Sequence, residues 1–391
     1  MTSKLMIKNI GAIVSGDLSR PLLDGDTLCA SGDTISFIGS LSQAPHEEYD
    51  TVIDAGGLSL LPGLIDANIH PPLGNYLERF KAYDWVDNYA GAGITGMVSA
   101  GSDRFTGAAR DREGAKIQAL AARRLWRELR PCGVKLHADA VVPVRDMTEE
   151  DFRELSQAGI RVLGELGAGP VKEVEEAAAY AGMARNAGMK SLLHTGGPAD
   201  REGVCYSLED IQKIRPDALC HVNGAPTPMG AADMKELVQS GRYQMNTASN
   251  GNMKSLLNIG RWAAESGNLD KLMLGTNAPS MAGYSPMGLW IQMAILSSYA
   301  DIPPEEAVAL ATGNISRFYD LDHGILQPGY KADLIFGETG SPMPDLLSTL
   351  RFGRVPSVAG TVVDGRFTLA RCKNTAPPKR RPLVHKARRN P

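Results

Sequence analysis

Four of the seven histidines in this 391-residue chain, together with one glutamate, stand at the ends of short apolar stretches. These residues are His70, His137, His194, His221 and Glu165. Imidazole nitrogens and a carboxylate that converge on one point can bind a divalent metal such as zinc or iron. A single histidine of this kind is more often a hydrogen-bonded core residue. Taken together, however, His194, His221 and Glu165 predict a metal site.

The apolar stretches alternate with segments of helical length. Eight strands are expected, with ends near Asn68, Ala100, Asp139, Glu165, His194, His221, Thr247 and Thr276. Helical patterns cover residues 113–129, 173–187 and 253–266 between them. This alternation predicts an α/β fold of the (β/α)8 barrel type, in which reactive groups stand at the carboxyl ends of strands. A doubly wound open sheet would alternate in the same way, but no GxGxxG motif opens a helix here.

Both ends of the chain carry strand patterns of another kind. Short apolar runs separated by Gly and Asp fill residues 1–60, and they return in residues 321–370, where residues 362–365 (VVDG) predict a hairpin turn. We therefore expect one small β-sandwich domain built from both segments. Residues 61–320 would form the barrel between them, and residues 371–391 would form a basic C-terminal tail.

Charge and composition narrow the classes of partner. The net charge of −3 argues against binding nucleic acid over the whole surface. The chain has no apolar run of about 20 residues that could span a membrane, and its first residues lack the pattern of a secretory signal. Its five cysteines show no paired spacing, which predicts free thiols and a cytoplasmic protein. The predicted tail holds eight Lys and Arg and no acid; we expect it to be solvated or packed on a neighbouring subunit, with polyanion binding as the alternative.

Several motifs resemble a known family. Residues 61–70 (LPGLIDANIH) resemble the PGxxDxHxH pattern at the start of the amidohydrolase superfamily. The resemblance continues in order through residues 164–165, 193–197, 221–224, 274–279 and 324–334. Within the superfamily the chain resembles most the enamidases, which hydrolyse a cyclic enamide. The resemblance implies a small-molecule substrate and a homo-oligomer, as a tetramer.

The same resemblance implies a site for two metals. One metal would use the HxH pair and an aspartate after strand eight. The other would use His194 and His221, and Glu165 would bridge the two. This chain has Asn68 in place of the first histidine of HxH and Asn277 in place of the aspartate. Because two divalent ions would carry a charge of +4 against the single negative charge of Glu165, we predict one metal, zinc or iron, or none.

The second replacement also affects catalysis. In the family, the strand-eight aspartate takes a proton from the attacking water and returns it to the leaving nitrogen. Asn277 has no proton to exchange in this way, so the base would be His70 or Glu165. His70 is the better candidate, because Glu165 would serve as a metal ligand. We therefore predict a catalytic group of His70, Asn277 and Asn68.

Further residues near the strand ends are candidates for substrate contact. Gly196 would permit close approach of backbone N–H groups to a substrate carboxylate. Tyr76 would lie over the barrel mouth and shape substrate choice. The predicted substrate-binding set is His137, Asp139, Tyr76, Thr195, Gly196 and Asn223.

The predicted activity is cleavage of a C–N bond in a small cyclic amide or heterocycle. A metal and a histidine without the water-activating aspartate also suit enolisation, ring closure or elimination, so a non-hydrolytic cyclase, lyase or isomerase is the first alternative. A non-catalytic relative is the second, although the remaining histidines argue against it.

Overall fold

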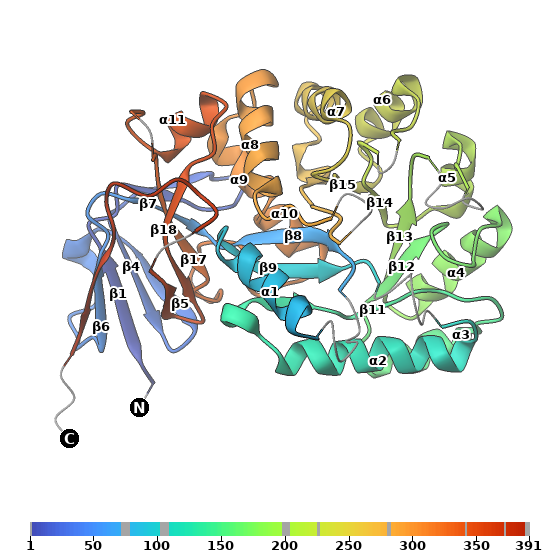
Figure 1. Cartoon of the computed structure of the whole chain (residues 1–391), viewed down its shortest axis with the longest axis horizontal. Helices are drawn as coiled ribbons and strands as arrows, with labels where there is room; N and C mark the ends of the chain where they lie inside the picture. The colour runs from blue at the N-terminus through green and yellow to red at the C-terminus, as the bar shows by residue number, and fades with distance from the viewer. Residues whose placement is uncertain are drawn as a thin grey trace.

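The computed structural model describes residues 2–71, 79–101, 109–197, 204–224, 227–279, 283–340, 342–370 and 373–387. It has a helix-covered barrel on one side and a unit of two β-sheets on the other, and both chain ends lie on the side of the sheets (Figure 1).

A ring of short parallel strands forms the barrel. The strands are β8 (Leu64–Ile69), β9 (Ile94–Ser99), β10 (Lys135–His137), β11 (Ala140–Val141), β12 (Val162–Leu166), β13 (Lys190–His194), β14 (Ala218–Cys220), β15 (Gln244–Asn246) and β16 (Leu272–Met273). β10 pairs with β9 and β11 pairs with β12, so these two short strands together take the third place in the ring. The ring closes where Asn277 N–H donates to Asn68 O over 2.9 Å and Ala67 N–H donates to Leu274 O over 3.2 Å. The prediction of a (β/α)8 barrel is therefore confirmed.

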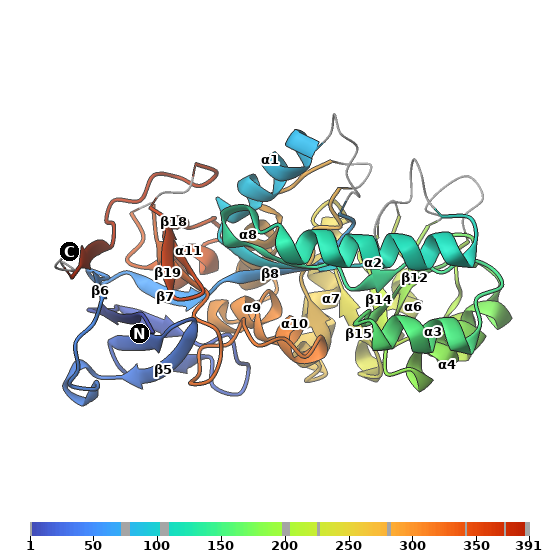
Figure 2. The same cartoon turned by 90° about the horizontal axis from the view of Figure 1, so that it is seen from below.

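Helices cover the outside of the ring (Figures 1 and 2). They are α1 (Arg79–Ala90), α2 (Arg112–Glu128), α3 (Glu149–Gln157), α4 (Val174–Asn186), α5 (Leu208–Ile214), α6 (Ala231–Ser240), α7 (Met253–Glu265), α8 (Gly288–Tyr299), α9 (Pro304–Leu310) and α10 (Gly313–Phe318). α2 shows why they lie as they do. Its buried residues Ala115, Ala119, Ala122 and Trp126 recur at helical spacing and make one apolar stripe, and Asp111 caps its first turn.

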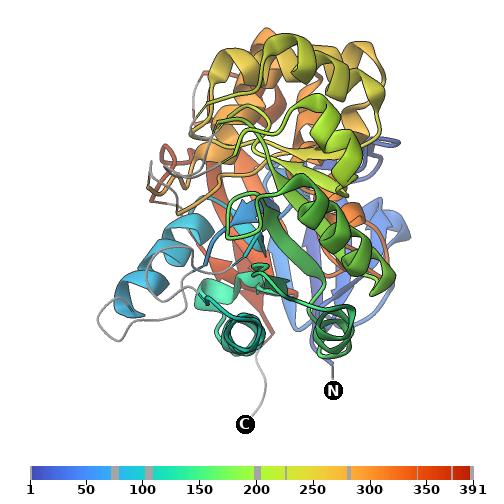
Figure 3. The ribbon, with the colours of Figure 1, turned by 90° about the vertical axis from the view of Figure 1, so that its right-hand side faces the viewer.

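Two sheets form the small β unit, which lies behind the barrel in Figure 3. One sheet has the order β20-β6-β1-β4-β5 and the other has the order β19-β18-β17-β7-β2-β3. Their strands are β1 (Lys4–Lys8), β2 (Ala12–Val14), β3 (Leu22–Leu23), β4 (Thr27–Ser31), β5 (Thr34–Gly39), β6 (Thr51–Asp54), β7 (Ser59–Pro62), β17 (Leu334–Glu338), β18 (Ser357–Val363), β19 (Arg366–Leu369) and β20 (Leu383–Lys386); the short helix α11 (Leu346–Arg351) lies between β17 and β18. A separate apolar cluster that includes Ile7, Leu60 and Phe336 joins strands from both chain ends.

The segment predicted as a basic tail contributes one of these strands. Residues 383–386 pair antiparallel with β6, so the prediction of a simple tail over residues 371–391 is wrong for this part. Pairing in a sheet requires only main-chain N–H and C=O groups, and an edge strand tolerates charged side chains on its exposed face. The basic composition of the segment therefore did not reveal the strand.

Candidate active site

One oxygen of Glu165 lies between two imidazole rings at the carboxyl ends of β12, β13 and β14. Glu165 Oε2 is 3.2 Å from His221 Nε2 and 3.5 Å from His194 Nδ1. All three side chains are buried, and their ligand atoms lie within 4.8 Å of one another. The structure thus brings together the three residues that the sequence predicted as metal ligands.

The hydrogen bonding of His194 indicates that a cation fits between these groups. His194 Nε2 lies 2.8 Å from Gly197 O, which can only accept, so Nε2 carries the proton of the neutral ring. The lone pair of Nδ1 then faces the carboxylate of Glu165, and this atom has no hydrogen-bond partner among the described residues. Two acceptors that face each other in a buried place repel unless a cation lies between them.

The other oxygen of Glu165 has different neighbours. Glu165 Oε1 accepts a hydrogen bond from Asn68 Nδ2 over 3.0 Å, and His70 Nε2 lies 3.5 Å away. The amide of Asn68 also donates to Asn246 Oδ1 over 3.3 Å. Because both neighbours are acceptors, the amide must present its nitrogen to them. An N–H group thus already occupies the side of the carboxylate that would face a second metal.

His70 is held with one nitrogen directed into this cluster. Its Nδ1 lies 3.1 Å from Gly101 O, so Nδ1 carries the proton of the neutral ring. Its Nε2 lies 3.1 Å from the carboxamide oxygen of Asn277. If His70 is neutral, Nε2 is an acceptor, and the Asn277 carboxamide must be turned over so that its nitrogen donates to Nε2. Either way, the structure pairs His70 with Asn277 and places both beside Glu165 and Asn68.

A buried aspartate joins the two strands that carry these asparagines. Asp66 on β8 accepts hydrogen bonds from Asn68 N over 3.2 Å, from Thr276 N over 2.8 Å and from the Thr276 hydroxyl. Burial raises the pKa of Asp66 to about 6, although the bonds from Thr276 work against this rise. These hydrogen bonds fix the carboxyl ends of the first and eighth barrel strands. Asn68 lies at the end of the first strand, and Asn277 directly follows Thr276 after the eighth.

The structure gives main-chain partners to three of the predicted substrate-binding residues. The Thr195 hydroxyl donates to Cys220 O, and the Asn223 amide exchanges two hydrogen bonds with the backbone of Ala248. Gly196 has a φ of +90°, and a Cβ there would lie 2.1 Å from Thr227 O. These contacts shape the loops after β13 and β14. They give each of the three residues a structural role that requires no substrate contact.

Two further predicted substrate contacts point elsewhere. The carboxylate of Asp139 pairs with Arg123 of α2 over 2.9 Å, on the outside of the barrel. His137 Nε2 lies 2.9 Å from His323 Nε2, and the two rings are stacked. The prediction that His137 and Asp139 face the substrate is not supported, because successive residues of a strand point to opposite sides and strand-end position alone does not choose the side. Tyr76 lies outside the described residues.

Sequence reasoning missed one residue of the cluster. Asn246 at the end of β15 is fully buried, and its Oδ1 accepts from His221 N over 2.8 Å as well as from Asn68. An asparagine at a strand end carries no distinctive sequence signal, and its place became visible only when the strands were assembled.

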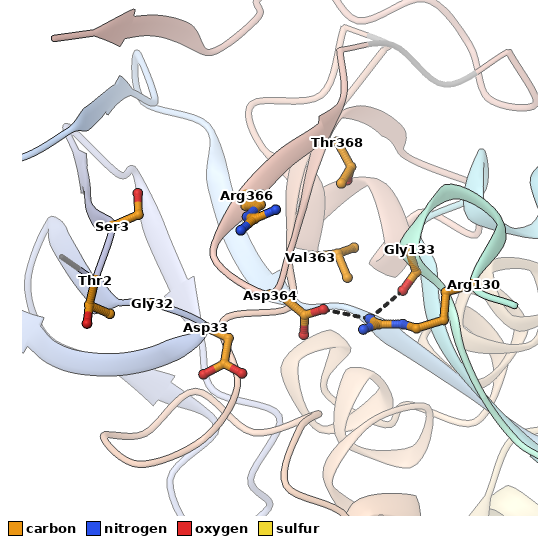
Figure 4. A pocket seen from close by; sticks show the side chains of 10 residues that line it. All are labelled: Thr2, Ser3, Gly32, Asp33, Arg130, Gly133, Val363, Asp364, Arg366 and Thr368. Atoms are coloured by element: carbon orange, nitrogen blue, oxygen red, sulfur yellow. Dashed lines mark hydrogen bonds and ion pairs between the residues drawn. The ribbon is translucent and has the colours of Figure 1, made fainter. Parts of the chain in front are cut away.

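A cavity with a volume of about 670 Å³ lies where the small β unit meets the barrel. On its wall, Arg130 forms an ion pair with Asp364 over 2.7 Å and donates a hydrogen bond to Gly133 O (Figure 4). Asp33 and Arg366 also line it. Its lining carries both positive and negative side chains, and it does not include Glu165, His194 or His221.

The described residues also bear on membrane spans and on disulfides. None of the helices there is long and apolar enough to cross a membrane. Cys29, Cys132, Cys205 and Cys220 form no disulfide with one another.

Comparison with known proteins places this architecture in a family. Residues 59–368 match the amidohydrolase family. The chain is 36% identical to an enamidase of Eubacterium barkeri over 380 residues, which cover 97% of this chain and 98% of that one. A crystal structure of enamidase superposes with a TM-score of 0.93, covering 98% and 100% of the two chains. An imidazolonepropionase of Arthrobacter is 33% identical, but over only 26% of this chain and 24% of its own. The chain therefore belongs to the amidohydrolase family, as an enamidase-like enzyme.

Proposed function

We propose that this enzyme hydrolyses the C–N bond of a small cyclic amide and that it does so with one divalent metal. The likeness to enamidase over nearly the whole chain supports the substrate class. The observation that carries the metal proposal is the unequal surroundings of the two oxygens of Glu165: Oε2 faces two imidazoles, whereas Oε1 is occupied by the N–H of Asn68.

His194, His221 and Glu165 would hold the metal. A neutral His194 can offer only Nδ1, because its Nε2 bonds Gly197 O. When bound, a zinc or iron ion would polarise the amide carbonyl and lower the pKa of water. Two imidazoles and one carboxylate leave the site a net charge of +1 with one ion and +3 with two, so a single ion is the better balanced occupant.

His70 is the proposed proton carrier. Hydrolysis forms a bond from the water oxygen to the carbonyl carbon and breaks the ring C–N bond. The proton that the water loses would pass to His70 Nε2 and then to the leaving nitrogen. The bond from Nδ1 to Gly101 O keeps the basic lone pair on Nε2, on the side of Glu165. Asn277 and Asn68 orient these two groups and exchange no proton.

Metal analysis beside turnover in labelled water tests this proposal. We expect about one metal ion per purified chain, none in His194→Ala, and one oxygen-18 atom from water in the new carboxylate of the ring-opened product of a cyclic enamide. An unlabelled product would favour the lyase or isomerase alternative. Two ions per chain, or none, would contradict the single-metal site.

We further propose that the enzyme is cytoplasmic and that several copies of the chain assemble. The spacing of the five cysteines suits a cytoplasmic enzyme, and the likeness to enamidase supports a homo-oligomer, as a tetramer. Light scattering coupled to gel filtration would give the mass of the assembly, and a mass of one chain would contradict the proposal. We also propose that the β-sandwich domain comprises residues 1–60 and 321–370 around a barrel of residues 61–320.

A further inference from the structure

We infer that Asn246 is a positioning residue for two of the proposed metal ligands, His221 and Glu165, which form the two halves of the metal-binding cluster. This inference rests on the proposed function. Asn246 belongs to β15, which contributes none of the proposed ligands. Its side chain is fully buried next to β14, whose last residue precedes His221.

The first half held by Asn246 is His221. This residue has a φ of +38°, a conformation that costs free energy for a side chain with a Cβ and persists only where neighbours enforce it. Asn246 Oδ1 accepts the His221 N–H over 2.8 Å, and Asn246 O accepts the next N–H, that of Val222, over 2.9 Å. One residue therefore fixes the backbone on both sides of the His221 Cα.

The second half is Glu165, which Asn246 reaches through Asn68. The same Oδ1 accepts from Asn68 Nδ2 over 3.3 Å, and that nitrogen also donates to Glu165 Oε1 over 3.0 Å. A carboxamide oxygen has two lone pairs, so it can accept both donors at once. The nitrogen of Asn246 lies 3.4 Å from Cys220 Sγ, a weak acceptor, and this contact agrees with the amide orientation that the two donors require.

This arrangement predicts that Asn246 sets the metal affinity without touching the metal. Loss of a partner that orients a ligand typically weakens metal binding about 10-fold to 100-fold. Asn246→Leu keeps the volume and removes the acceptor, whereas Asn246→Asp keeps an oxygen for the His221 N–H. We expect Asn246→Leu to bind zinc about 10-fold to 100-fold more weakly in a chelator competition assay, and Asn246→Asp to recover most of the loss.

A matched control separates positioning from general stability. Asn314 is also buried, and its amide donates to Leu269 O and Leu272 O at the other end of the barrel. Asn314→Leu should lower the melting temperature and leave the zinc affinity of the folded protein unchanged. If Asn246→Leu does not fold, Asn246→Ser, which leaves room for water, should show the same loss of affinity. Parental zinc affinity in a folded Leu or Ser variant would overturn the inference.

Hydrogen exchange at the His221 amide gives a readout that needs no metal. We expect exchange of this amide to be at least about 10-fold faster in Asn246→Leu than in the parent, because its acceptor is gone. If the parent holds no metal, the proposed single-metal site fails, and the exchange rate alone then decides the role of Asn246. Unchanged exchange would overturn that role.

Discussion

Asn68 has an amide where the family pattern has an imidazole, and the exchange alters what Glu165 can bind. An imidazole at this position would offer a lone pair to a second metal, and the carboxylate could then bridge two ions. The amide instead donates to Glu165 Oε1 over 3.0 Å. A hydrogen bond from a neutral amide to the carboxylate thus takes the place of a contact between the carboxylate and a second metal ion.

Restoring both family residues should restore the second metal. Asn68→His with Asn277→Asp supplies an imidazole and a carboxylate, and it removes the N–H from Glu165 Oε1. We expect the metal content to rise from about one to about two ions per chain, measured by elemental analysis after dialysis against zinc. Asn68→Ala with Asn277→Ala removes the same amides without adding ligands and should stay at one. A restored variant that also stays at one would show that something other than these two residues excludes the second ion.

His70 should matter for turnover more than for metal binding. Removal of a general base typically lowers the rate about 100-fold to 10,000-fold. We expect His70→Gln to lower kcat on a cyclic enamide by that order and to keep the metal content of the parent. His46→Gln, at an exposed histidine of the β unit, is the control. A kcat near the parental value in His70→Gln would assign the proton transfer to another group.

At the scale of elements, the loop after β13 depends on a glycine. Gly196 has a φ of +90°, and its missing Cβ lets Thr227 O approach. The next residue, Gly197, accepts from His194 and donates to Thr227 O over 2.8 Å. The close approach therefore sets the orientation of a proposed metal ligand.

Gly196→Ala should consequently affect both stability and the metal site. We expect it to cost more than about 2 kcal/mol of unfolding free energy and to weaken zinc binding. Gly188→Ala is the matched control, because Gly188 also has a positive φ, +74°, but has open space around it. That variant should cost about 1 kcal/mol and leave zinc binding unchanged. Chemical denaturation and chelator competition measure the two effects, and equal costs for the two variants would contradict the role of the contact.

The sequence predicted the elements well where hydrophobic periodicity was strong. The predicted helix over residues 113–129 is α2 at Arg112–Glu128, and the predicted turn in residues 362–365 is the two-residue hairpin at Asp364 and Gly365, both with positive φ. The sequence did not predict β20, because this strand is four residues long, lies at a sheet edge and is held mainly by main-chain hydrogen bonds.

The site was predictable only in part, for a related reason. His194, His221 and Glu165 were identifiable because three residues of ligand type stand at the carboxyl ends of three successive strands, and these ends meet on one side of a barrel. Strand-end position did not reveal that Asp139 turns outward to Arg123. Nor could it reveal Asn246, whose role exists only through bonds to residues far away in the chain.

At the scale of the whole molecule, a chain of charges joins the barrel to the small β unit. Lys135 of β10 pairs with Asp333 and Asp364, and Arg130 pairs with Asp364. Beside them, burial and, to a lesser extent, the charge of nearby Lys135 lower the pKa of His137 to about 4. Burial also lowers the pKa of His323 well below its usual value.

These two histidines predict a loss of stability in acid. Their folded-state pKa values lie below the unfolded value of about 6.5, so the stabilisation is complete above that pH and is lost as the pH falls toward about 4. Between pH 7 and pH 5 we expect His137 to account for roughly 1–2 kcal/mol of lost unfolding free energy. The double variant His137→Asn with His323→Asn should lose less than the parent over this range, measured by urea denaturation. An equal loss in both proteins would place the acid sensitivity elsewhere.

The pairing of β7 with β17 has a consequence for how the molecule is made. β7 ends at Pro62, and its neighbour β17 begins at Leu334, so more than 270 residues separate two adjacent strands. On the ribosome, the N-terminal strands emerge first and remain without this partner while the whole barrel is synthesised. A nascent chain of this protein therefore carries an unfinished apolar sheet edge until the barrel has been synthesised, and the strands from Leu334 onward are the ones that cover it.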